Sequence, residues 1–274
     1  MNLKDYFLII RPTNCFIAAI GAFIGYSLAI GSIQFSNLLV MYAMLAVFFV
    51  CAGGQTINDY FDFAIDRKAK KERALVKGNI SRMNALYYSF ILFLTGIIIS
   101  YFIHFTAFIV AIIFSLLLIF YSGFLGKYKF IGNWIVAFSV AFTIIYGALI
   151  EMWFCLPLVL FFSALLSNAG REITKDMEDL ETEKGVKITL PQKISFPVLN
   201  HFILILYLGA IIIGFIPLYW NRLNNVFYLF FMVLAVISLM YSVKLLQGRN
   251  FRKSQAYSKI GMGLGLIAFL LGLL

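Results

Sequence analysis

Residues 83–126 read MNALYYSFILFLTGIIISYFIHFTAFIVAIIFSLLLIFYSGFLG, a stretch that contains no Asp, Glu, Lys or Arg. An α-helix rises about 1.5 Å per residue, so this stretch would be about 66 Å long, roughly twice the ~30 Å hydrocarbon core of a bilayer. It therefore has to turn back once, and His104 with Thr106 supplies the polar break for the turn. A barrel strand would alternate polar and apolar residues, which residues 116–119 do not. The stretch predicts a hairpin of two transmembrane helices.

The rest of the chain repeats this pattern. Three further apolar runs are long enough for a hairpin and a shorter one crosses once: residues 12–57, 130–170, 194–243 and 257–274. Weak polar breaks mark the remaining turns at Gly31 to Ser36, at Glu151, and at Trp220 to Asn225. A composition of 62% hydrophobic and 12% charged residues also exceeds what a soluble domain of 274 residues can bury. The sequence predicts an all-α, multi-pass membrane bundle of about nine transmembrane helices, with residues 1–274 as a single domain.

The positive charges predict the orientation of this bundle. Every Lys and Arg except Arg222 is predicted on the side of the amino terminus. Basic residues mark the cytoplasmic side, so we expect a cytoplasmic amino terminus and an outside carboxyl terminus in the cell membrane. The net charge of +10 is then explained by topology and anionic lipid, and no nucleic acid partner is expected. Every acidic residue except Glu151 shares that side, which orientation does not require.

The first acidic cluster, NDYFDFAID at residues 58–66, stands at the end of the second predicted helix. At about 100° per residue, spacings of three and four place Asp59, Asp62 and Asp66 within a sector of roughly 60° on one helical face. Like charges on adjacent helical turns repel one another, so such a face needs a counter-ion. The alternative is a solvated or salt-bridged helix end. A single cluster does not decide between these readings.

The second acidic cluster, DMEDLETE at residues 176–183, lies just past the sixth predicted helix and repeats the spacing of three and four with Asp176, Asp179 and Glu183, which predicts the same one-faced helical geometry. Two such clusters on one side disfavour the purely structural alternative. Oxygen ligands suit hard cations, and Mg²⁺ takes one or two carboxylates, keeps several waters and adds phosphate oxygens. The sequence therefore predicts a magnesium and diphosphate site at one membrane face, with basic residues nearby to meet phosphate charge: Arg67, Lys68, Arg73, Arg171, Lys175 and Lys184.

With both clusters in view, the chain resembles the UbiA family of intramembrane prenyltransferases over nearly its whole length. The family has an Asn-Asp-x-x-Asp-x-x-x-Asp motif and a later Asp-x-x-Asp-x-x-x-Asp motif. The first is matched completely by Asn58, Asp59, Asp62 and Asp66, and in the second Glu183 stands in place of the final Asp. YSGFLGK at residues 121–127 is similar to the Tyr-Ser-x-x-Leu-Lys segment of the family, with Lys127 one place late.

The resemblance implies cleavage of the allylic carbon–oxygen bond of a prenyl diphosphate, with Mg²⁺ as the cofactor. It implies four principal metal ligands, Asp59, Asp62, Asp176 and Asp179, and outer positions for Asp66 and Glu183. Lys127 and Arg171 would contact phosphate oxygens, Asn58 would contact the metal or phosphate, and Tyr121 would orient a substrate. Three polar residues at the same helix ends would bind substrate or, equally, neighbouring helices: Asn14, Asn133 and Asn168.

The acceptor is less constrained by these motifs. Residues 168–191 are most similar to the archaeal branch of the family that transfers a geranylgeranyl group to geranylgeranylglyceryl phosphate in ether lipid biosynthesis. This implies a lipidic phosphate acceptor within the membrane lipid. Other branches prenylate aromatic rings in quinone pathways, and the two clusters do not distinguish these acceptors. A cation transporter is the competing class of protein, although acidic residues confined to one interface give it no path across the membrane.

Overall fold

The computed structural model describes residues 3–68, 72–183, 185, 187–223 and 225–274. These residues form helices and contain no β-strand. The chain divides into two compact units, Met1–Phe23 with Phe35–Lys127, and Ile24–Gln34 with Tyr128–Leu274. Helix α2 (Pro12–Ile30) contributes residues to both units. The single domain predicted from the sequence stays a prediction.

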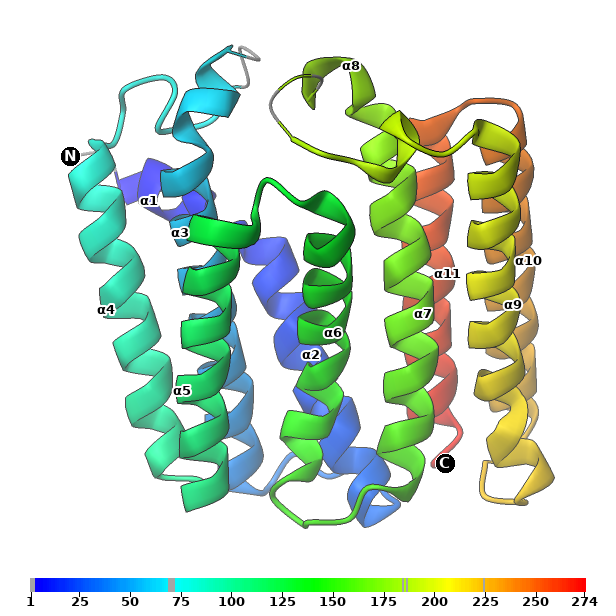
Figure 1. The fold of residues 1–274 in the computed structure, drawn as a ribbon. Helices are drawn as coiled ribbons and strands as arrows, with labels where there is room; N and C mark the ends of the chain where they lie inside the picture. Colours follow the sequence, from blue (N-terminus) through cyan, green and yellow to red (C-terminus); the bar gives the residue numbers. More distant parts are fainter. Residues whose placement is uncertain (1–2, 69–71, 184, 186, 224) are drawn as a thin grey trace. The chain divides into compact units, whose positions relative to one another are not determined.

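The first unit is built around the long helix α3. Its helices are α1 (Leu3–Ile9), the first part of α2, α3 (Leu38–Lys68), α4 (Arg82–Tyr101), α5 (Phe105–Phe120) and the π-helical segment η1 (Tyr121–Leu125). Helix α3 packs along α4 and α5 (Figure 1). With 31 residues, α3 is about 46 Å long and exceeds the ~30 Å apolar core of a bilayer. The turns that carry the first acidic cluster therefore extend beyond the apolar span.

The second unit is built around α7. Its helices are the end of α2, α6 (Lys129–Ala148), α7 (Cys155–Glu178), α8 (Leu180–Glu183), the short 3₁₀ segment η2 (Leu190–Gln192), α9 (Phe196–Tyr219), α10 (Val226–Gln247) and α11 (Phe251–Leu271). Helix α7 packs against α6, α9 and α11, and α10 lies along α11 (Figure 1). Ile203, Tyr207 and Leu246 are buried in the main apolar cluster of this unit. This packing fixes the end of α7, where the second acidic cluster begins.

The predicted hairpins are confirmed as α2–α3, α4–α5, α6–α7 and α9–α10, with α11 as the last helix. Their turns hold capping residues: His104 Nδ1 accepts the backbone N–H of Thr106 at 3.2 Å, and Asn225 Oδ1 accepts that of Tyr228 at 2.8 Å. In the described part of the chain, eight helices are long and apolar enough to cross a membrane. Helix α11 is also 21 residues long, but it carries three basic residues in its first half: Arg252, Lys253 and Lys259.

Helices α2 and α6 approach closely at Gly25, as small residues allow in membrane bundles. A Cβ atom on Gly25 would lie 1.8 Å from the carbonyl oxygen of Ile144. We expect Gly25→Ala to lower the free energy of unfolding by at least about 1–3 kcal/mol, because the two backbones have to separate. The measurement is the melting temperature in detergent. Gly263→Ala is the matched control, since its Cβ would meet nothing within 4 Å. Equal melting temperatures for the two variants would contradict the close approach.

Candidate functional site

The first acidic cluster lies on the last turns of α3, so its predicted helical geometry is confirmed. Asp59 and Asp66 are buried, with 4% and 1% of their surface exposed. A carboxylate so far from water needs charged or hydrogen-bonding partners. Asp62 is half-buried and accepts a hydrogen bond from Asn58 Nδ2 at 3.3 Å. Asn58 and Asp62, both predicted site residues, therefore contact each other directly.

Two arginines contact the buried carboxylates of this cluster. Arg73 Nη1 donates to Asp59 Oδ1 at 2.7 Å and also to Asp66 Oδ2. Arg11 Nη2 donates to the same Asp59 oxygen at 2.5 Å. One nitrogen of Arg73 thus lies within hydrogen-bond distance of both carboxylates. The structure places the predicted residue Arg73 at the cluster and adds Arg11, which sequence reasoning missed.

Arg11 reaches Asp59 from the turn between α1 and α2. Its φ of 49° lies in the left-handed region, and the following Pro12 disfavours helical backbone at this position. Such backbone strain is often found at functional sites. The same end of the unit is held by Asn79 Nδ2, which donates to Asp5 Oδ1 at 3.0 Å and ties α1 to the segment that carries Arg73. Helix α1 therefore supports the position of both arginines.

The segment that resembles the Tyr-Ser-x-x-Leu-Lys pattern lies beside the first cluster. Tyr121 begins the π-helical segment η1 and is half-buried. A Cβ atom on Gly123 would lie 3.2 Å from the ring of Phe61. Phe61 stands between Asp59 and Asp62 in the sequence of α3. Single π-helical turns often occur at functional sites. Tyr121 is thus brought to the helix that carries the first cluster, whereas the Lys127 side chain is exposed.

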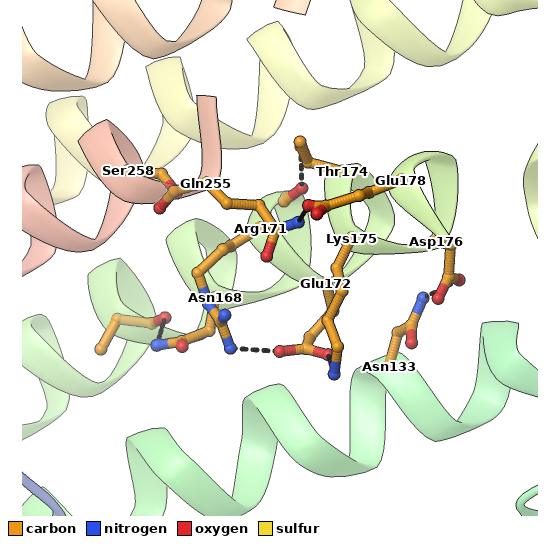
Figure 2. A network of polar contacts seen from close by, with 12 residues as sticks. Asn133, Asn168, Arg171, Glu172, Thr174, Lys175, Asp176, Glu178, Gln255 and Ser258 are labelled. Atoms are coloured by element: carbon orange, nitrogen blue, oxygen red, sulfur yellow. Dashed lines mark hydrogen bonds and ion pairs between the residues drawn. The ribbon is translucent and has the colours of Figure 1, made fainter. Parts of the chain in front are cut away.

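In the second cluster, Asp176 lies in the last turn of α7 and is fully buried. Asn133 Nδ2 on α6 donates to its Oδ2 at 2.7 Å (Figure 2). Lys129 Nζ, also on α6, lies 3.4 Å from its Oδ1. The backbone N–H of Lys129 donates to Ile188 O at 3.0 Å, which ties the loop after the cluster to α6. Sequence reasoning missed Lys129, although its spacing of four from Asn133 puts both on one helical face.

The predicted geometry of the second cluster is wrong in one respect. The three-then-four spacing predicted one continuous helical face, but α7 ends at Glu178. Asp179 is the C-cap, its N–H donates to Lys175 O at 2.9 Å, and the separate turn α8 follows. The two clusters therefore differ in shape. Glu183 ends α8 with a side chain outside the described residues, and Lys184 also lies outside them.

The end of α7 also carries a buried carboxylate that was not predicted (Figure 2). Glu172 is 4% exposed and contacts Arg171, and Lys175 Nζ lies 3.5 Å from its Oε2. Glu178 accepts a hydrogen bond from Gln255 Nε2 on α11 at 2.5 Å. The predicted phosphate contacts Arg171 and Lys175 thus share a carboxylate partner, and α11 fixes the end of α7.

The other predicted residues lie as follows. Asn168 is buried and donates to Ala164 O at 2.9 Å, so its amide satisfies its own helix. Asn14, Arg67 and Lys68 have exposed side chains. Within the described ranges, no three Asp, Glu, His or Cys side chains form a ready-made metal site. Mg²⁺ is compatible with this arrangement because it uses few carboxylates and completes its shell with water and phosphate. Each cluster belongs to a different compact unit.

The sequence profile described as the UbiA prenyltransferase family matches residues 18–270. The chain therefore belongs to the UbiA prenyltransferase family, and it is a prenyltransferase. This match confirms the resemblance that the motifs indicated. It confirms the prediction of a multi-pass membrane fold. It also decides for an enzyme against the cation transporter.

Among the relatives of the chain are archaeal digeranylgeranylglyceryl phosphate synthases. That of Methanocaldococcus jannaschii is 36% identical over 277 residues, which cover 99% of this chain and 96% of that protein. That of Thermococcus kodakarensis is 40% identical over 193 residues, covering 70% and 69%. A solved structure of a digeranylgeranylglyceryl phosphate synthase has a TM-score of 0.81 and 34% identity, covering 99% and 98%. A UbiA homologue from Aeropyrum pernix, 14% identical over 94% of this chain and 98% of that one, has the same fold (TM-score 0.80).

Proposed function

We propose that this chain transfers a geranylgeranyl group from geranylgeranyl diphosphate to geranylgeranylglyceryl phosphate, a magnesium-dependent step of archaeal ether lipid biosynthesis. One observation supports the choice of acceptor: the similarity to digeranylgeranylglyceryl phosphate synthases extends over 99% of the chain at 34–36% identity. Similarity confined to the two motifs would not distinguish this acceptor from an aromatic ring.

The residues at the two acidic clusters fit magnesium in their chemistry. They offer hard oxygen donors, and two of the carboxylates lie around a single cationic nitrogen of Arg73. We assign the metal to Asp59, Asp62, Asp176 and Asp179 as principal ligands, with Asp66 and Glu183 in outer positions. When bound, magnesium stabilises the negative charge that develops on the diphosphate leaving group. A UbiA homologue from Archaeoglobus fulgidus, 17% identical with a TM-score of 0.68, was solved bound to DMAPP and Mg²⁺, so this fold accommodates such a pair.

In the proposed reaction the allylic carbon–oxygen bond of the donor breaks and diphosphate leaves with the electron pair. The hydroxyl oxygen of the acceptor bonds to the allylic carbon and gives up its proton to the released diphosphate. Basic residues meet the phosphate charge, for which the flat guanidinium of arginine is well suited: Arg67, Lys68, Arg73, Lys127, Arg171, Lys175 and Lys184. Asn58 contacts metal or phosphate, and Tyr121 orients a substrate. We also assign substrate binding to Asn14 and Asn168.

The location follows from the distribution of basic residues. We assign the amino terminus and both clusters to the cytoplasmic side of the cell membrane and the carboxyl terminus to the outside. The apolar helices surround the prenyl tails of the donor and the acceptor with a lipid-like environment, next to a diphosphate that faces water. A water-soluble phosphate head and a membrane-embedded tail are the two parts that both proposed substrates have.

The direct test uses purified protein, labelled geranylgeranyl diphosphate, and separate acceptors. We expect product with geranylgeranylglyceryl phosphate, and at least a ~100-fold lower rate after chelation of magnesium that excess Mg²⁺ restores. Hydroxybenzoate and a naphthoate serve as aromatic acceptors. Product with an aromatic acceptor and none with geranylgeranylglyceryl phosphate would overturn the assignment. A rate that is unchanged by chelation would overturn the magnesium dependence.

A further inference from the structure

We infer that Arg73 competes with magnesium for the carboxylates of the first acidic cluster, and that a diphosphate opens the cluster to the metal by drawing Arg73 away. The inference rests on the proposed function, because it takes Mg²⁺ and a diphosphate as the ligands. It assigns to Arg73 a second role besides phosphate contact: a tethered cation that occupies the ligand oxygens until the diphosphate arrives.

The contacts of Arg73 provide the first argument. Its Nη1 bonds Asp59 Oδ1 and Asp66 Oδ2, and the two carboxylate side chains are only 5% and 2% exposed. The same oxygens are the donors that a hard cation would use. A guanidinium and a divalent cation on the same oxygens repel one another, strongly so where water is scarce. Arg73 and a metal ion therefore compete for these carboxylates.

The position of Arg73 provides the second argument. It lies outside α3, in the segment that leads to α4, where its carbonyl accepts the N–H of Lys77 at 2.9 Å. Leu75 and Ile80 of that segment are 4% and 3% exposed and pack in the apolar cluster of the first unit. The backbone is thus anchored while the guanidinium, whose side chain is 24% exposed, borders solvent. Arg73 can change its partner without moving Asp59 or Asp66.

Arg11 explains why Asp59 still has a cationic partner when Arg73 leaves. It contacts Asp59 Oδ1 independently of Arg73, from the turn between α1 and α2. When Arg73 turns to the diphosphate, Asp59 keeps Arg11 on Oδ1 and offers its other oxygen, Oδ2, to the metal, which then faces one guanidinium in place of two. Arginine binds phosphate through two parallel hydrogen bonds, so the diphosphate offers Arg73 a full replacement. By reciprocity, whatever diphosphate adds to metal affinity, the metal adds to diphosphate affinity.

The test measures two ligands separately on the detergent-purified full chain. Mn²⁺ alone is titrated by its electron paramagnetic resonance signal, and inorganic pyrophosphate alone by calorimetry in EDTA. For Arg73→Gln we expect Mn²⁺ to bind at least about tenfold more tightly than to the unchanged protein, and pyrophosphate at least about tenfold more weakly. Opposite signs are the signature, because general damage to the site would weaken both ligands.

The controls locate the effect. Arg82→Gln removes the same charge in the same unit from a guanidinium that lies over the Tyr60 ring at 4.4 Å, and should change neither affinity. Adding Asp59→Asn to Arg73→Gln should remove the gained Mn²⁺ affinity. Should Arg73→Gln fail to fold, Arg73→Met removes the charge and keeps an unbranched side chain of similar length, so Mn²⁺ should again bind more tightly than to the unchanged protein.

Equal or weaker Mn²⁺ binding by the folded Arg73 variants would overturn the competition. Pyrophosphate binding that is unchanged in Arg73→Gln would overturn the exchange of partners. Neither titration contains a prenyl substrate or an acceptor. A failure of the proposed function would instead show as absent prenyl transfer by the unchanged protein, so the two failures are distinguishable.

Discussion

Asp59→Asn should lower the rate of prenyl transfer by about 10²–10⁴-fold at saturating magnesium. Asparagine keeps the shape of the side chain but removes the charge and one acceptor of a carboxylate that is 4% exposed and bonded to Arg11 and Arg73. Without that charge, the first cluster loses a principal proposed metal ligand. The measurement is the initial rate of transfer from labelled geranylgeranyl diphosphate, over a range of magnesium concentrations.

Glu72→Gln is the matched control for Asp59→Asn. It is the same chemical change in the same unit, at an acidic side chain that is 87% exposed and lies 3.2 Å from Lys77 Nζ. A surface ion pair of this kind contributes little, so we expect full activity. Melting temperatures of both variants show whether the bundle is intact. A folded Asp59→Asn protein that transfers the prenyl group at the unchanged rate would contradict the assignment of Asp59.

Asp176→Asn should also reduce transfer by about 10²-fold or more, because the proposed charge stabilisation depends on both clusters. Asp176 is fully buried and contacts Lys129 and Asn133, so its removal also disturbs a buried charge pair. Removal of one partner from a buried pair is strongly destabilising, whereas replacement of both is often neutral. The variant alone would therefore confuse loss of a ligand with loss of stability.

The double variant Lys129→Met/Asp176→Asn separates these effects. It removes both charges of the pair, and we expect a melting temperature closer to that of the unchanged protein than Asp176→Asn has. If Asp176 serves magnesium, transfer stays lost in the double variant despite the recovered stability. Recovery of transfer together with stability would show that Asp176 is only a structural partner of Lys129.

The membrane fold could be predicted from the sequence because bilayer thickness fixes the length of a span. Residues 83–126 are uncharged over twice that length, and the structure turns at His104 as predicted. The first cluster could be placed on one helical face because α3 continues to Lys68. The length of the uncharged run was sufficient for the fold and the helical spacing for the cluster, since each depends on residues close in sequence.

The rest of the site depends on contacts that local sequence patterns do not contain. Arg11 and Asp59 are 48 residues apart, and only the packing of α1 and α2 on α3 brings them together. The end of α7 was missed because neither Gly nor Pro marks a stop between Asp176 and Glu183. The family resemblance indicated Lys127, whose side chain is exposed. The buried lysine that contacts Asp176 is instead Lys129.

We propose that both acidic clusters act on one metal-bound diphosphate. The most direct measurement is an experimental structure of the full chain with Mg²⁺ and a non-reactive thiolo analogue of geranylgeranyl diphosphate. We predict that carboxylate oxygens of Asp59 and Asp176 both contact magnesium ions bound to the same diphosphate. A diphosphate held by one cluster, with the other cluster remote from it and from the metal, would contradict the claim.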